Sequence, residues 1–157
     1  MNKIIMGCAL TLGVMLSSVA AQAAPGQVAL QGDVKLEKTV VEAGQAHVVL
    51  VDPKTVIPGD HLLFTTRYAN AGSAVVRNFV VTNPLPAAVV LAPDAVSGAL
   101  VSVDAGRTWG ELAQLTVADG KGGRRPAQAS DVTHIRWTIP AIAAGASGKV
   151  EYHAIVR

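Results

Sequence analysis

The sequence contains one cysteine, few aromatic side chains and little charge. The cysteine, Cys8, lies in an apolar segment at the start of the chain that we expect to be removed on export. The remaining chain then has no thiol, which excludes disulfides, thiolate metal sites and a cysteine nucleophile. Charged residues make up 15% of the chain and leave a formal net charge of +2, so no basic excess indicates a nucleic-acid partner and no acidic tail is present. The stability of the fold must therefore come from packing alone.

Residues 1–23 have the pattern of a signal peptide. Lys3 supplies the positive charge, residues 4–16 form a short apolar run, and Ala21-Gln22-Ala23 offers small residues where a signal peptidase cuts. The apolar run is shorter than the roughly 18–20 residues that span a bilayer; the alternative is an uncleaved anchor helix. We expect cleavage after Ala23, a periplasmic or secreted protein, and no stable membrane span after cleavage.

The remaining residues, 24–157, suffice for one domain with a proper core and are too few for two. Valine and threonine are abundant in them, and both favour the half-buried surface of a sheet. Short apolar segments alternate with turn residues, and no amphipathic helix is visible. This pattern predicts an all-β sandwich. The expected strands are 28–36, a hairpin of 40–41 with 47–51, 61–68, 75–82, 89–91, 101–103, 112–117, 134–139 and 149–157, and residues 119–130 are expected to be a surface loop.

Alternation within three of these strands identifies the core. Phe64 and Tyr68 share one phase and Arg67 lies in the other, which marks the second phase as exposed. Trp137 and Tyr152 lie in the inward phase of the last two strands. We expect the core to centre on these four aromatic residues. We also expect the last two strands to be antiparallel neighbours, because a glycine-rich turn joins them.

Several motifs together resemble a known family. They are Pro58-Gly59-Asp60, Tyr68-Ala69-Asn70-Ala71-Gly72, Val81-Thr82-Asn83-Pro84-Leu85-Pro86 and Gly145-Ala146-Ser147-Gly148. In combination they resemble the conserved-repeat domain of bacterial surface proteins, catalogued as domain of unknown function eleven. The resemblance implies an immunoglobulin-like antiparallel β-sandwich and a non-enzymatic structural or interaction module of the cell envelope. A protein partner would then bind through a sheet edge or a surface loop.

A second motif runs from Ser102 to Trp109. It matches the Asp-box, Ser-x-Asp-x-Gly-x-Thr-Trp, of sialidases and other glycan-processing propellers, where the box is structural. We expect a hairpin in which Asp104 accepts bonds from backbone N–H groups, Gly106 takes the left-handed conformation and Trp109 plugs the core. The alternative is a glycan-binding module that uses Asp104 and Trp109.

Three basic residues, Lys121, Arg124 and Arg125, fall in the expected surface loop. They are interpreted as solvated side chains, and the alternative is contact with an acidic partner, a lipid head group or a polysaccharide.

His134 and His153 are candidate metal ligands. If their strands were neighbours, the two Cβ atoms would lie about 5 Å apart, close enough to share a metal ion. Glu151 is the one nearby candidate for a third ligand. A periplasmic metal-binding protein is therefore a further alternative, although we expect no cofactor. We also expect no enzyme, because the sequence lacks a Gly-x-Ser-x-Gly elbow and an evident pair of catalytic carboxylates.

Overall fold

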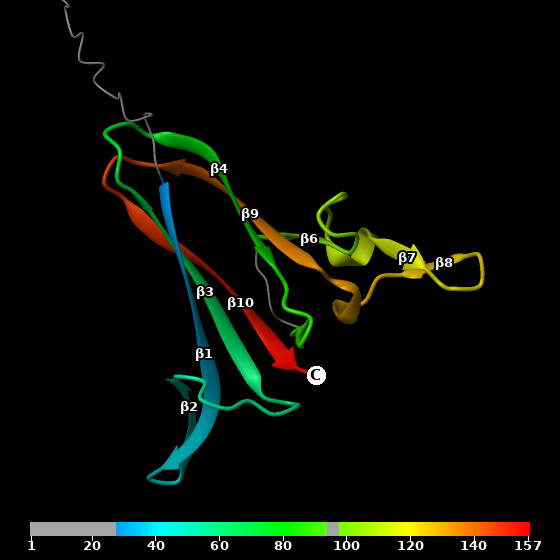
Figure 1. The fold of residues 1–157 in the computed structure, drawn as a ribbon. Coiled ribbons are helices and arrows are strands. Elements are labelled where there is room, and N and C mark those ends of the chain that lie inside the picture. The colour runs from blue at the N-terminus through cyan, green and yellow to red at the C-terminus, as the bar shows by residue number, and fades with distance from the viewer. Residues whose placement is uncertain (1–27, 94–97) are drawn as a thin grey trace, which may run out of the picture.

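The computed structural model describes residues 28–93 and 98–157 and shows antiparallel sheets packed against each other (Figure 1). The expected all-β sandwich is confirmed. One sheet has the strand order β2-β1-β3-β10-β5 and the other β4-β9-β6, while β7 and β8 form a separate hairpin. The strands are β1 (Val28–Glu42), β2 (Gln45–Val51), β3 (His61–Asn70), β4 (Val76–Pro84), β5 (Val89–Leu91), β6 (Leu100–Ser102), β7 (Thr116–Ala118), β8 (Arg124–Pro126), β9 (His134–Ile142) and β10 (Ser147–Val156).

The expected signal peptide and its cleavage site lie outside the described residues. Within the described residues, the helical segments are two short 3-10 turns, η1 (Leu112–Gln114) and η2 (Ala129–Asp131). No helix in that part of the chain has the length and apolar character needed to cross a membrane.

The five-stranded sheet is built around β3. Phe64 on β3 lies between Val34 on β1 and Tyr152 on β10, and the Phe64 and Tyr152 rings stack with centroids 4.8 Å apart. Tyr152 is buried, whereas Phe64 and Tyr68 are half-buried and pack against the core. The expected inward phase of β3 is therefore correct.

The three-stranded sheet covers β3 and β10 from the other side. Ile135 and Trp137 point inward from β9, and the Trp137 ring lies 6.2 Å from the ring of Tyr152 across the sandwich. For β4 the sequence did not predict which side chains point inward, because both phases of the strand are apolar. The structure places the buried Val81 inward and the exposed Val80 outward.

The first two strands form a hairpin that is longer than expected. β1 runs without a break through Gly32 for 15 residues. The two-residue turn Ala43-Gly44 joins it to β2, and both turn residues have positive φ, as a tight hairpin turn requires. β1 pairs with β3 as far as Glu37, and with β2 from Leu36 to Glu42.

The last strand lies inside the five-stranded sheet, between β3 and β5. Its end is tied on both sides: the Val156 N–H donates to the Asp60 carbonyl, and the Arg157 N–H donates to the Ala88 carbonyl, each at 2.9 Å. The Gly59 N–H donates in return to the Val156 carbonyl at 2.9 Å. The Pro58-Gly59-Asp60 turn therefore holds the C-terminal end of β10.

The expected pairing of the last two strands is wrong. β9 lies in the three-stranded sheet and β10 in the five-stranded sheet, so the segment between them crosses from one sheet to the other (Figure 1). The connection from β3 to β4 crosses at the same end, and both crossings meet at Asn70. Its buried side-chain amide donates to the carbonyls of Ala74, Ile142 and Ala143 at 2.8–3.1 Å. The glycines at this end thus form a crossing between sheets and not a hairpin.

The expected loop at residues 119–130 is also wrong in part. Residues 124–126 form strand β8, which pairs with β7, and η2 follows. The strand was missed because Arg124-Arg125-Pro126 has neither apolar alternation nor β-branched residues. The expected strand at 112–117 begins with the 3-10 turn η1, and the paired strand β7 begins only at Thr116.

Asn70 provides a direct test of the crossing. We expect Asn70→Ala to lower the free energy of unfolding by about 2–4 kcal/mol, because it leaves backbone carbonyls at the crossing without their donor. Asn70→Asp keeps the side-chain oxygen that accepts from the Gly72 N–H but removes the donor, and should be nearly as destabilising. Urea unfolding followed by circular dichroism measures both variants.

Asn83→Ala is the matched control. Asn83 donates a single side-chain bond, to the Thr66 hydroxyl at 2.7 Å, so its loss should cost about 1 kcal/mol. Equal costs at Asn70 and Asn83 would contradict the role given to Asn70.

Candidate functional site

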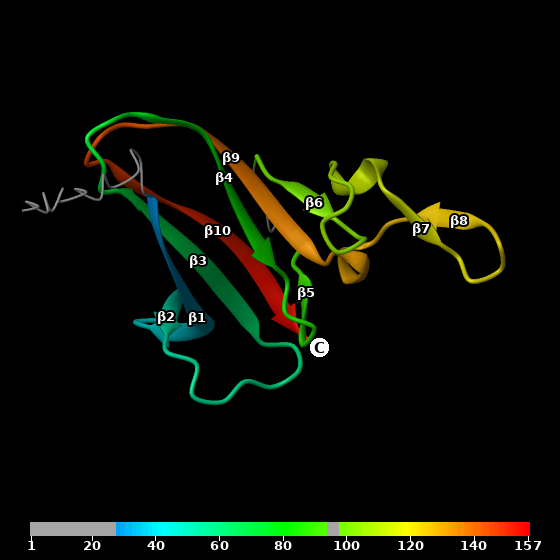
Figure 2. The same ribbon diagram turned by 45° about the horizontal axis from the view of Figure 1, so that its top comes forward.

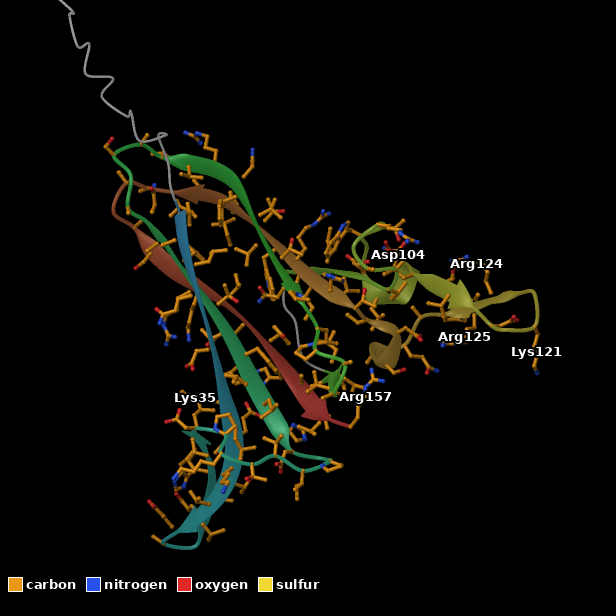
Figure 3. The ribbon with its side chains drawn as sticks, in the orientation of Figure 1. Lys35, Asp104, Lys121, Arg124, Arg125 and Arg157 are labelled. Carbon is orange, nitrogen blue, oxygen red and sulfur yellow. The ribbon has the colours of Figure 1, made fainter. Side chains whose placement is uncertain are left out.

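The residues singled out from the sequence lie in separate parts of the molecule. Figure 3 shows Asp104, Lys121, Arg124 and Arg125 together at the end that carries the β7–β8 hairpin, far from Lys35 at the base of the β1–β2 hairpin. The two histidines lie on opposite sheets. We describe each place in turn.

Asp104 is saturated by bonds from its own hairpin. Its Oδ1 atom accepts from the backbone N–H groups of Arg107 and Thr108, at 3.1 and 2.9 Å, and from the Ser102 hydroxyl at 2.8 Å. Its Oδ2 atom accepts from the Thr108 hydroxyl at 2.7 Å. These bonds, led by the one from the Thr108 N–H, lower the pKa of Asp104 from 3.8 to about 2. The carboxylate therefore holds the hairpin together, as the motif predicts.

The backbone of this hairpin also matches the expectation. Gly106 has φ of 85° and its N–H donates to the Ser102 hydroxyl at 2.9 Å. Val101 and Gly110 exchange backbone bonds and close the hairpin. The Ser102 carbonyl accepts from the Thr133 N–H at 2.8 Å, which fastens the hairpin to the start of β9.

Trp109 does not plug the main core, which corrects one expectation. It is half-buried, and its indole N–H donates to the Gly106 carbonyl at 3.0 Å. The Arg136 guanidinium lies 4.3 Å from the ring centroid, and the His134 ring meets it edge-on at 6.4 Å. One face of the indole is therefore covered by a cation that the ring itself attracts. A sugar would have to displace Arg136 or stack on the remaining face.

The pH dependence of stability tests the role of Asp104. The folded pKa lies below its ordinary value, so the carboxylate stabilises the fold above about pH 4, and this contribution is lost as the pH falls through about 2. We expect the difference in Tm between the wild type and Asp104→Asn to be largest near neutral pH and to shrink towards pH 2.

Thr108→Val is the matched partial variant, because it removes one of the four bonds to Asp104 and leaves the carboxylate in place. Its difference from the wild type should have the same sign and pH trend but a smaller size. A Tm difference for Asp104→Asn that stays constant with pH would rule out this account.

Two of the three basic side chains are engaged by residues of their own hairpin or of the following turn η2. Arg124 donates to the hydroxyl and the carbonyl of Thr116 on the facing strand, at 2.6 and 2.7 Å. Arg125 forms a two-bond ion pair with Asp131 at 2.7 and 2.8 Å, and this pair lowers the pKa of Asp131. Lys121 is exposed at the tip, as Figure 3 shows. The structure thus gathers the three residues on one hairpin without forming a patch of three exposed cations.

Asp119 was missed by the sequence analysis. Its Oδ1 atom accepts from the backbone N–H groups of Lys121 and Gly123, at 2.8 and 2.9 Å, which lowers its pKa. It shapes the tip of the β7–β8 hairpin as Asp104 shapes the neighbouring one. The signal was an aspartate followed by glycine in a turn.

The histidine pair expected from strand pairing is not formed. His134 lies on β9 in the three-stranded sheet, where its Nδ1 atom is 3.1 Å from the Thr133 hydroxyl. His153 lies on β10 in the five-stranded sheet, where its Nδ1 atom is 2.8 Å from Glu37 Oε1. The expected proximity is wrong because the two strands belong to different sheets. Within residues 28–93 and 98–157, no group of three or more His, Cys, Asp or Glu side chains is placed to hold a metal ion.

Glu151, the suggested third ligand, has other partners. It accepts from the Lys149 ammonium, at 2.8 and 2.9 Å, and from the Thr65 hydroxyl at 2.8 Å. The Lys149 bond is the main cause of its lowered pKa.

The feature that the sequence analysis missed is the surface of the β1–β2 hairpin. At its base, Lys35 pairs with Asp52 and Asp33, and the bond to Asp52 raises the pKa of Lys35. Beyond this base the hairpin carries two of the three most exposed large apolar side chains of the described chain: Val41 is 70% exposed and Val48 is 61% exposed. The available signal was the strand sequence of β2, Gln-Ala-His-Val-Val-Leu-Val, which carries no formal charge beside its one histidine.

Comparison with known proteins does not assign the chain to a family. No family model matches the chain, and neither a curated protein nor a solved structure shows significant similarity to it. The resemblance to the conserved-repeat domain therefore stays a prediction.

Proposed function

We propose that this protein is a non-enzymatic interaction module of the bacterial cell envelope, and that it binds a protein partner through the β1–β2 hairpin. The observation that carries the proposal is a hairpin with exposed apolar side chains that projects from the sandwich. Residues 38–49 extend beyond His61, where β3 begins, and in Figures 1 and 2 β2 lies away from the three-stranded sheet. A two-stranded hairpin without a covering layer is marginally stable in water. A surface of this kind is typical of one that a partner covers.

The arrangement of the polar groups supports the same proposal. The conspicuous polar side chains at the opposite end, Asp104, Arg125 and Asp131, satisfy one another or the local backbone. Among the described residues, no buried side-chain nitrogen or oxygen lacks a hydrogen-bond partner. Groups of this kind hold the fold, whereas the hairpin is exposed and has no evident role within the sandwich.

The compartment and the family rest on the sequence. The signal-peptide pattern of residues 1–23 supports export, and the motif combination supports an immunoglobulin-like member of the conserved-repeat family. A sandwich with a projecting hairpin that exposes apolar side chains suits a docking module of the periplasm or the cell surface.

Site-specific crosslinking in the native cell tests the proposal. A photo-crosslinking amino acid in place of Val41 should yield a reproducible adduct with a protein, because this side chain is 70% exposed on the proposed surface. The same replacement at Val80, which is 47% exposed on the outer side of β4, is the matched control and should yield none. An affinity tag belongs just after Ala24, because the C-terminus is tied into the sheet through Arg157.

Mass spectrometry of the adducts then identifies the partner. Adducts at Val41 and not at Val80 would support docking through the hairpin. The absence of any protein adduct at Val41 at native abundance would count against the proposal and favour a small ligand.

The glycan-binding alternative has its own test. In a Trp137→Phe variant, Trp109 is the one remaining tryptophan, and we expect its fluorescence to stay unchanged when glycans are added, because Arg136 covers one face of its ring. A saturable change in this variant that disappears when Asp104→Asn is added would favour glycan binding instead.

A further inference from the structure

The edge strands of the sandwich differ in how well they are protected against pairing with another chain. Natural edge strands carry charges, prolines, bulges or very few residues, because an open row of backbone N–H and C=O groups recruits further strands. β5 and β6 have three residues each. β4 carries Arg77 and ends at Pro84, and Asn78, with φ of 51°, interrupts its pairing with β9.

β2 has none of these protections. It is the outer strand of the five-stranded sheet, and its seven residues include no proline, no glycine, and no Lys, Arg, Asp or Glu. Four of the seven are valine or leucine, the residues that suit a paired strand. A protein with an exposed, uncharged edge strand of this composition is prone to aggregate unless a partner covers the edge.

We propose that the partner covering β2 is a second copy of this protein, through antiparallel pairing of the two β2 strands. The proposal rests on the proposed function, because it assigns the occupant of the same hairpin. The two five-stranded sheets would then join edge to edge into one continuous sheet.

The pattern of β2 is self-complementary. A two-fold axis at Val48 uses all seven residues and keeps equivalent faces together. Val48 then meets Val48 of the second copy, Ala46 lies opposite Leu50, and His47 lies opposite Val49. At the centre valine meets valine, and on the same face alanine meets leucine, while no carboxylates or ammonium groups face each other along the pair.

The other edges explain why pairing stops at two copies. A two-fold contact uses the same strand on both copies and leaves no second β2 free. The short β5 and β6 strands and the interrupted β4 strand do not offer an equivalent template, and the part of β1 that β2 leaves open carries Gly32, Asp33 and Lys35. The contact is small, so the dimer should dissociate on dilution.

Val48 allows a sharp test, because the proposed axis makes it meet itself. Val48→Lys and Val48→Glu each place like charges opposite each other, and each should weaken self-association by about tenfold or more. An equimolar mixture of the two variants should recover a dimer that contains one copy of each. Sedimentation velocity of the exported, purified protein, from micromolar to near-millimolar concentration, measures self-association of the wild type, of each variant and of the mixture. Native mass spectrometry identifies the mixed dimer.

Val80→Lys is the matched control, since it also adds a charge to an exposed valine on an edge strand. It should dimerise like the wild type, and circular dichroism should show all variants folded. A wild type that stays monomeric throughout would overturn self-pairing. A wild-type dimer that survives both Val48 variants would also overturn it, because the contact would lie elsewhere.

The experiments distinguish a failure of self-pairing from a failure of the proposed function. If the protein is monomeric but Val41 crosslinks to a different envelope protein, the hairpin is a docking site and self-pairing is wrong. If dimerisation follows the expected charge pattern while no adduct of any kind forms at Val41 in cells, self-pairing holds in solution and the proposed envelope role fails.

Discussion

The side-chain amide of Asn70 is the contact on which the topology depends. Two crossings between the sheets, from β3 to β4 and from β9 to β10, meet at one end of the sandwich, and this amide bonds to backbone carbonyls of both. A buried carbonyl without a donor is costly, so the amide makes the two crossings mutually dependent. Placing β9 and β10 in opposite sheets follows from the crossing, and it brings Trp137 against Tyr152 in the core. The remaining strands assemble around this pair.

The two sheets are unequal, and this inequality positions the proposed docking surface. Three strands face five, so the three-stranded sheet covers β3 and β10 and leaves β1 and β2 at the margin. Leu36 is the one buried residue of β1. Beyond it, the hairpin is held by its own backbone pairs and by the Lys35–Asp52 contact at its base. The smaller sheet therefore completes the core over β3 and β10 but leaves apolar side chains of the β1–β2 hairpin exposed.

Local patterns in the sequence predicted local structure well. Alternation identified the inward phases of β3, β9 and β10, and the Asp-box predicted the bonds of Asp104 and the left-handed Gly106, because the residues involved lie within a few positions of one another.

Pairing between strands is not local, and there the prediction failed. A glycine-rich segment after β9 looked like a hairpin turn, and only the contact with Asn70, more than 70 residues earlier in the chain, makes it a crossing. The error carried over to His134 and His153, whose expected proximity depended on that hairpin. The exposure of β2 could not be predicted for a related reason. An apolar strand is expected to be buried, and whether it is depends on how many strands the opposing sheet has.

The position of β10 has a consequence for the order of folding. Of the described strands it is the last along the sequence, yet it lies between β3 and β5 and supplies Tyr152 to the core. A chain still missing its final residues lacks the middle of its larger sheet, and the contacts that close the sheet span most of the chain length. Such non-local contacts form late and slowly. The larger sheet therefore stays open until β10 has inserted between β3 and β5, and this step needs strands that are far apart in the sequence.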